Sequence, residues 1–181
     1  MSRITIIDSS NANAEQQALL DAIQSQLGMV PNFLKVFADS PAALRAFLGL
    51  YGVANEGSQA HQTRERIALA LAQQNGCEYC VSAHTAIGRK SGLTGDEINA
   101  ARHGTSEDAQ AALAVQFATS LMEKKGDVSA IEIAQLRSAG FTDADIVEII
   151  THVGMNFLTN ILGKASKVEI DFPQVDLKLA A

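Results

Sequence analysis

The 181-residue sequence lacks the features that mark membrane and secreted proteins. Its uninterrupted apolar stretches, of which residues 67–72 form one of the longest, fall well short of the roughly 18 residues that span a bilayer. The apolar stretch at residues 4–7 is too short for a secretory signal. We therefore expect a cytoplasmic protein with no membrane partner.

Basic residues are too few and too scattered for a nucleic-acid-binding surface. Lys and Arg together number 14 and Asp and Glu number 20, which gives a formal net charge of −6. Nucleic-acid binding normally depends on a concentrated positive patch, so we expect no nucleic-acid partner. Hydrophobic residues make up 47% of the chain, as in an ordinary globular domain.

Proline is also rare, and none occurs between residues 42 and 172. This interval is rich in Ala, Leu, Gln and Glu, which favour helices, and it shows no strand-like alternation. We predict a single all-helical domain over residues 1–181, with N-terminal helices in 1–40, a core in 41–165 and an extended tail in 166–181. The predicted helices span about 13–27, 31–38, 41–55, 63–75, 77–91, 95–103, 106–125, 130–139 and 143–163.

Two corners between predicted helices carry matching cap signals. Thr94 and Thr142 each follow a Gly that ends one helix, and each precedes an acidic residue by three positions. This spacing is typical of a capped helix start, with the apolar neighbours of each Thr packed against the first turn. Both segments therefore predict tight connections between consecutive helices.

Cysteine occurs only twice, as Cys77 and Cys80. In a reducing compartment this spacing indicates redox chemistry or metal binding before a structural disulfide. Asn75 and Gly76 mark the end of one predicted helix, which places both cysteines at the start of the next. At about 100° per residue, Cys77, Cys80 and His84 project from one narrow sector. The sequence thus predicts two thiols and an imidazole on one helix face.

Glu65 lies in the preceding predicted helix and is expected to reach the same site. If the two helices run antiparallel about Gly76, Glu65 and His84 are offset by about 4.5 Å along the axis, at about 1.5 Å per residue. A Glu side chain, directly or through one water, spans that offset. We therefore predict a proton relay that joins Glu65, His84 and Cys80.

The residues alone leave open which thiol is the nucleophile. The positive end of the helix favours a thiolate at Cys77, whereas the imidazole of His84 favours one at Cys80. We choose Cys80 as the attacking thiol and Cys77 as its disulfide partner. A thiolate that attacks a peroxide forms a sulfenic acid, which condenses with the neighbouring thiol, and an external dithiol then restores the pair.

The order Glu, eleven residues, Cys, two residues, Cys, three residues, His resembles the signature of the alkylhydroperoxidase D-like branch of the carboxymuconolactone decarboxylase family. Flanking segments extend the resemblance over roughly residues 28–173, namely GMVPNF at 28–33, SP at 40–41 and GLT at 92–94. Members of this family often carry His before the second Cys, where this sequence has Tyr79.

The resemblance implies an all-helical bundle with the CxxC pair at the N-terminus of a central helix, assembled as a homo-oligomer, either a trimer or a hexamer. It also implies an alkyl hydroperoxide reductase-like enzyme, a peroxidase that takes electrons from an external dithiol or protein reductant and needs no bound cofactor. Carried over by position, Cys80 is the peroxidatic thiol, Cys77 the resolving thiol, and His84 and Glu65 the relay.

Two other interpretations remain open. The CxxC pair could belong to a non-enzymatic redox sensor or assembly module whose disulfide alters packing at a subunit contact. Less favoured is a zinc-binding structural protein, because Cys77, Cys80 and His84 spread over about 10 Å of helix axis, and one tetrahedral ion would strain to reach all three.

The remaining candidate residues are expected to have structural roles. Tyr79 is interpreted as an ordinary packing residue. His61, His103 and His152 lack partners at informative spacing, so we expect them at the surface or at an interface. The last long helix carries an apolar stripe at helical spacing, which predicts core or subunit packing, formed by Ile146, Ile149, Ile150, Val153, Phe157 and Ile161.

Overall fold

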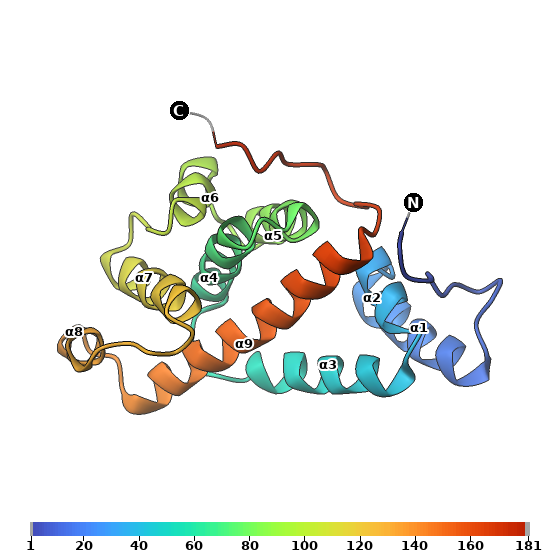
Figure 1. Ribbon diagram of the computed structural model, residues 1–181, viewed down its shortest axis with the longest axis horizontal. Coiled ribbons are helices and arrows are strands. Elements are labelled where there is room, and N and C mark those ends of the chain that lie inside the picture. Colours follow the sequence, from blue (N-terminus) through green and yellow to red (C-terminus); the bar gives the residue numbers. More distant parts are fainter. Residues whose placement is uncertain (1, 180–181) are drawn as a thin grey trace.

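The computed structural model describes residues 2–179 and contains nine helices and no strand over that range (Figure 1). The helices are α1 (Ala14–Leu27), α2 (Asn32–Phe37), α3 (Pro41–Ala54), α4 (His61–Gln74), α5 (Glu78–Lys90), α6 (Gly95–Arg102), α7 (Ala109–Glu123), α8 (Ala130–Ser138) and α9 (Asp143–Ser166). The predicted all-helical fold is confirmed. The bounds differ most at α4, which begins at residue 61 instead of 63, at α7, which begins at 109 instead of 106, and at α9, which continues to 166 instead of 163.

Helix caps explain where several elements begin. Thr94 and Thr142 are the N-caps of α6 and α9, and their side chains accept hydrogen bonds from the third backbone N–H of each helix. At α9 the capping is reciprocal, because Asp145 accepts from the backbone N–H of Thr142 at 2.7 Å. At α6 the equivalent acid, Glu97, departs from this pattern and pairs with Arg66 of α4.

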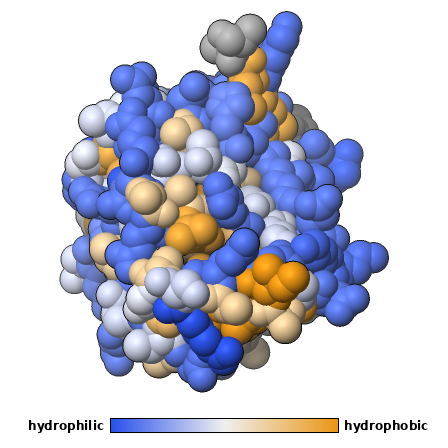
Figure 2. All heavy atoms as spheres, turned by 90° about the vertical axis from the view of Figure 1, so that its left-hand side faces the viewer, coloured by the Kyte–Doolittle hydropathy of each residue, from blue (hydrophilic) through white to orange (hydrophobic). Residues whose placement is uncertain are grey.

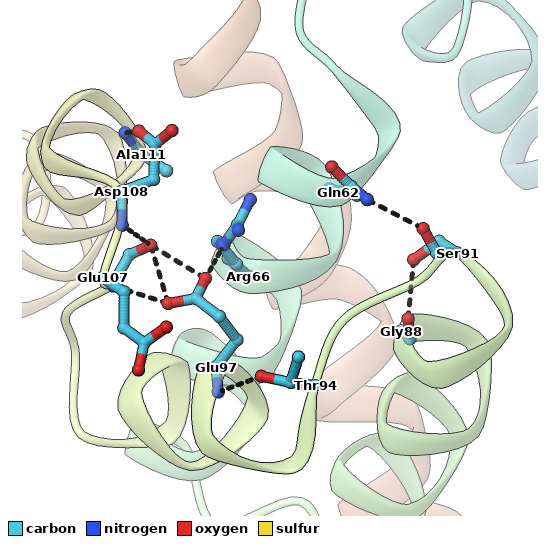
Figure 3. A network of polar contacts seen from close by, with 10 residues as sticks. Gln62, Arg66, Gly88, Ser91, Thr94, Glu97, Glu107, Asp108 and Ala111 are labelled. Atoms are coloured by element: carbon cyan, nitrogen blue, oxygen red, sulfur yellow. Dashed lines mark hydrogen bonds and ion pairs between the residues drawn. The ribbon is translucent and has the colours of Figure 1, made fainter.

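The Glu97 carboxylate is the centre of a polar network that fixes α4 against its neighbours (Figure 3). It accepts a hydrogen bond from Ser106 Oγ at 2.9 Å as well as from Arg66. Burial raises the pKa of Glu97, but the backbone N–H of Glu107 and the Arg66 guanidinium outweigh it and hold the pKa below its usual range. Gln62 of α4 also donates to the Ser91 carbonyl at the end of α5, at 2.9 Å. These contacts tie α4 to α6 and to the end of α5.

Helix α4 lies at the centre of the fold and packs against α5, α6, α7 and α9. Its residues 67–72 are all at most 3% exposed, so every face of this segment is covered. Gly76 turns the chain into α5 with φ +64°, a left-handed conformation that glycine adopts at little cost. The CxxC pair therefore begins a helix that packs directly on the central one.

Two larger hydrophobic clusters flank this centre. One joins the N-terminal helices to the start of α5 and includes Leu20, Ile23, Phe33, Leu34, Phe37, Leu44, Phe47, Tyr79, Val81 and Met155. The other joins α4, α7, α8 and α9 and includes Ile67, Leu71, Val115, Phe117, Leu121, Leu136, Phe141, Ile146, Ile149 and Val153.

Helix α9 crosses the bundle and packs against α2, α3, α4, α5 and α7 (Figure 1). Of the helices in residues 2–179, it alone is long and apolar enough to cross a membrane by length and composition, with an 18-residue window of mean hydropathy 1.3. The sequence contains no uninterrupted apolar run of this length, because polar residues interrupt α9. Core helices of globular proteins meet the same criteria.

The chain after α9 runs without helix along the outside of α5 toward α6 (Figure 1). Val175 N–H donates to Ser82 Oγ at 3.0 Å, and Gln73 Nε2 donates to the Leu177 carbonyl at 2.8 Å. Arg102 of α6 donates to the Asp176 carbonyl at 2.5 Å. Side chains from three helices thus hold this tail in place.

Candidate active site

The two cysteines occupy the first turn of α5. Cys77 is the N-cap, and its Sγ accepts a hydrogen bond from Cys80 N–H at 3.3 Å. The two sulfurs form a disulfide, with Cα atoms 5.2 Å apart. The structure therefore holds the CxxC pair in its oxidised form at the positive end of a helix, where backbone N–H groups stabilise a thiolate once the bond is reduced.

Helix α9 approaches the disulfide at a glycine. A Cβ atom at Gly163 would lie 2.9 Å from Cys77 Sγ and 3.6 Å from Cys80 Sγ, so only glycine leaves room for both sulfurs. Cys80 Sγ also lies 3.9 Å from the Thr159 carbonyl oxygen of α9. Sulfur and α9 backbone are therefore in direct contact.

Glu65 and His84 meet as the antiparallel pairing of α4 and α5 predicts. Glu65 Oε2 lies 2.9 Å from His84 Nδ1, a direct hydrogen bond that needs no bridging water. Glu65 is buried, and the side chain of His84 is 22% exposed. The carboxylate orients the imidazole, so its other nitrogen, Nε2, is left for proton exchange.

A cavity of about 690 Å³ opens in front of this pair, between α1, α2, α3, α5, α9 and the tail. Cys80 and His84, one helical turn apart, both line it, whereas Cys77 does not. Its other walls are mainly aliphatic and aromatic, and none of its lining residues within 2–179 is Asp, Glu, Lys or Arg. The cavity thus presents one sulfur and one imidazole to an apolar space.

Tyr79, between the two cysteines, is a linking residue as well as a packing residue. Its hydroxyl accepts from Phe33 N–H at 3.2 Å and donates to Asp171 Oδ1 at 2.8 Å. Burial and the Asp171 carboxylate raise the pKa of Tyr79, so the phenol stays protonated. Its ring stacks on Phe33 and meets the edge of Phe172, which lines the cavity. Tyr79 therefore ties the tail to the cavity wall.

Two further histidines, His61 and His152, lie near Glu65, where the sequence did not predict them. His61 Nε2 lies 3.6 Å from Glu65 Oε1, so Glu65 stands between two imidazoles. His61 precedes Glu65 by four residues, a spacing that brings side chains together on a helix and could have revealed the pair. His152 of α9 is buried and donates to the Ala54 carbonyl, and burial and Arg64 lower its pKa. His152 is therefore neutral near pH 7.

The predicted site residues Glu65, His84, Cys80 and Cys77 thus lie together, from α4 and the first turns of α5. Within residues 2–179, no group of three or more His, Cys, Asp or Glu side chains is arranged to hold a metal ion. The geometry is that of a reversible dithiol beside an imidazole and a carboxylate, which is chemistry for electron and proton transfer.

Residues 41–124 match the model of the carboxymuconolactone decarboxylase family. This segment carries Glu65, Cys77, Cys80 and His84. A comparison with curated proteins found no match.

Solved structures with the same fold include peroxidase-related proteins. An uncharacterized one from Silicibacter sp. TM1040 is 28% identical, with a TM-score of 0.80 over 92% of both chains. An uncharacterized protein with an alkylhydroperoxidase AhpD core from Ralstonia eutropha JMP134 is 22% identical, with a TM-score of 0.83 over 94% of this chain and 92% of that one.

A further structure with this fold is the debrominase Bmp8 in complex with 2,3,4-tribromopyrrole, which is 18% identical, with a TM-score of 0.76 over 94% of this chain and 92% of that one. At this identity the likeness concerns the fold alone. Residues 41–124 are thus similar to the carboxymuconolactone decarboxylase family, and the chain has the same fold as the protein with the alkylhydroperoxidase AhpD core.

Proposed function

We propose that this protein is a thiol-dependent peroxidase that reduces organic hydroperoxides and is recycled by an external dithiol. One observation carries the proposal: Cys80 and His84 line the same cavity, while Glu65 holds His84 and Cys77 is bonded to Cys80. A nucleophile, its base, the orienting acid and the resolving thiol are then all within one site.

The oxidative half of the cycle needs these four side chains only. In the reduced protein His84 takes the proton of the Cys80 thiol, and the thiolate attacks the outer oxygen of the hydroperoxide. The S–O bond forms as the O–O bond breaks, and the leaving alkoxide takes the proton from His84 to become an alcohol. The Cys77 thiol then attacks the sulfenic sulfur of Cys80, which releases water and forms the disulfide.

The reductive half needs a second substrate. An external dithiol attacks the disulfide through a mixed disulfide, leaves both cysteines as thiols and is itself oxidised to a disulfide. Because Cys80 lines the cavity and Cys77 does not, Cys80 is the sulfur that both substrates reach first.

The composition of the cavity walls favours an organic hydroperoxide as substrate, in preference to hydrogen peroxide. Its walls are mainly hydrocarbon, and burial of an alkyl group against them is favourable by roughly 25 cal/mol per Å² of apolar surface. Hydrogen peroxide has no apolar part and gains nothing from these walls. We therefore expect cumene hydroperoxide to be reduced faster than hydrogen peroxide.

An assay that couples hydroperoxide consumption to a dithiol tests the proposal with two variants. Cys80→Ser is expected to abolish turnover, and Cys77→Ser is expected to consume one equivalent and leave a trapped sulfenic acid at Cys80. Parent-like turnover in both variants would contradict the proposed mechanism. Oxidation of the parent once, without cycling, would favour the redox-sensor interpretation instead.

A further inference from the structure

The buried carboxylate of Glu65 contacts two imidazoles, only one of which faces the cavity. Oε2 lies 2.9 Å from His84 Nδ1, and Oε1 lies 3.6 Å from His61 Nε2. The side chain of Glu65 is 10% exposed and that of His61 is 51% exposed. His84 lines the cavity and His61 does not. Glu65 therefore connects a cavity residue to a solvent residue.

We propose that His61 is the solvent end of a proton relay that runs through Glu65 to His84. This inference rests on the proposed function, because His61 would be a positioning residue that relays protons for the same site. His61 touches neither substrate nor sulfur, and it acts through Glu65.

The relay matters when the cavity is occupied. A bound organic substrate or a docked dithiol covers the exposed part of His84, so the imidazole no longer exchanges protons with bulk water through the cavity. Each reductive half-cycle still requires that thiols of the donor lose protons and that Cys77 and Cys80 regain them. A route through Glu65 to an exposed imidazole keeps the base in equilibrium with solvent.

The two oxygens of Glu65 suit such a transfer. His84 takes a proton on Nε2 and gives its Nδ1 proton to Oε2, which makes Glu65 a neutral carboxylic acid. When the carboxyl group turns, this acid gives the same proton to Nε2 of neutral His61 and becomes a carboxylate again, and His61 releases its Nδ1 proton to water. His61 Nε2 lies 3.6 Å from Glu65 Oε1, so the exposed ring must move closer by a few tenths of an ångström to form a hydrogen bond. Its exposure leaves it free to do so.

Other charged groups near Glu65 come from three helices. Tyr51 of α3 is close enough that burial and the Glu65 charge raise its pKa. Arg64 lies on α4 itself, and α9 contributes His152 and Glu148. All four are the same in a His61 variant, so a difference between that variant and the parent reports on His61.

The proposal predicts that His84 continues to exchange protons with solvent when the cavity is filled, because the route through Glu65 stays open. In His61→Gln the second imidazole is gone, so this exchange is expected to slow while the cavity is filled. Gln retains a side chain that can reach Glu65, so the start of α4 is preserved.

Nuclear magnetic resonance of the ¹⁵N-labelled imidazoles tests this without turnover, in the oxidised protein with the cavity filled by cumyl alcohol. The N–H of His84 is expected to exchange with solvent roughly tenfold more slowly in His61→Gln than in the parent. His103→Gln, which removes an exposed histidine at the C-terminal end of α6, is expected to leave this exchange rate unchanged. An unchanged exchange rate of His84 in His61→Gln overturns the proposal.

Turnover gives a second readout. His61→Gln is expected to lose about tenfold in kcat with KM for cumene hydroperoxide unchanged, and added free imidazole is expected to restore part of this loss, because it replaces the missing proton carrier. A loss that imidazole leaves unchanged, as a merely structural role gives, overturns the relay. If the exchange of His84 depends on His61 in a parent protein that shows no turnover, the peroxidase proposal fails and the relay stands.

Discussion

The glycine at position 163 is the residue on which the contact between α9 and the disulfide depends. Gly163→Ala would place a Cβ atom 2.9 Å from Cys77 Sγ, in a region where the sulfurs are at most 4% exposed. We expect the free energy of unfolding of this variant to be about 1–3 kcal/mol lower than that of the parent, because α9 or the CxxC turn must move. Chemical denaturation of the oxidised proteins measures the difference.

Gly154 on the same helix provides a matched control. A Cβ atom there meets nothing within 4 Å, and the position is exposed. Gly154→Ala is expected to stabilise the protein by about 0.5–1 kcal/mol through helix propensity alone. Equal effects of the two substitutions would show that the sulfurs do not constrain position 163.

At the scale of elements, Tyr79 fastens the tail and α2 to the start of α5. Tyr79→Phe removes the hydroxyl that accepts from Phe33 N–H and donates to Asp171. We expect a loss of about 1–3 kcal/mol in the free energy of unfolding, because the Phe33 N–H is buried and loses this partner. Hydrogen exchange of residues 171–179 is expected to speed up as the tail loosens, whereas exchange in α7 stays unchanged. Equal protection of the tail in both proteins would contradict this role.

The contact between α9 and α3 makes stability depend on pH through His152. Burial, reinforced by Arg64, lowers the folded-state pKa of His152 below its ordinary value of 6.5. The unfolded chain therefore binds this proton more readily, so the stabilisation is complete above about pH 6.5 and is lost as the pH falls through the folded-state value.

Denaturation between pH 7 and pH 5 measures the effect of His152. The free energy of unfolding is expected to decrease over this range in the parent and to decrease less in His152→Asn. His103→Gln is the control and is expected to keep the slope of the parent, since His103 is exposed. An identical slope in the parent and His152→Asn would show that His152 does not titrate with folding.

Local signals in the sequence predict the helices and the Glu65–His84 pair. The sequence does not predict contacts between segments that are far apart along the chain. Thr94 and Thr142 mark their helices because a cap is a local interaction. Glu65 reaches His84 because the turn at Gly76 fixes the register of two adjacent helices. Gly163 meets Cys77 across 86 residues, and no periodicity along the chain reports such a contact.

At the scale of the whole molecule, apolar side chains are distributed unevenly over the surface. The face that carries α7 and α8 is mainly hydrophilic, with small apolar groups (Figure 2). On α9 the predicted apolar stripe divides: Ile146, Ile149 and Val153 are buried in the core, whereas Ile150, Phe157 and Ile161 are exposed. A row of exposed apolar side chains on one helix is typical of a protein contact surface.

We propose that copies of the chain associate through these exposed residues of α9, as the implied trimer or hexamer requires. Phe157→Lys is expected to shift the mass measured by light scattering from that of an oligomer to that of the monomer. Ile131→Lys on α8, also an exposed apolar position, is the control and is expected to leave the mass unchanged. A monomeric parent protein would contradict the proposal.

The central claim is that Cys80 and Cys77 convert a hydroperoxide into an alcohol and water by forming a disulfide. Mass measurement of the fully reduced protein after one equivalent of cumene hydroperoxide tests it most directly. We predict the loss of two hydrogen atoms from the Cys77–Cys80 peptide and the appearance of one equivalent of alcohol. A reduced pair that remains intact while hydroperoxide persists would contradict the account.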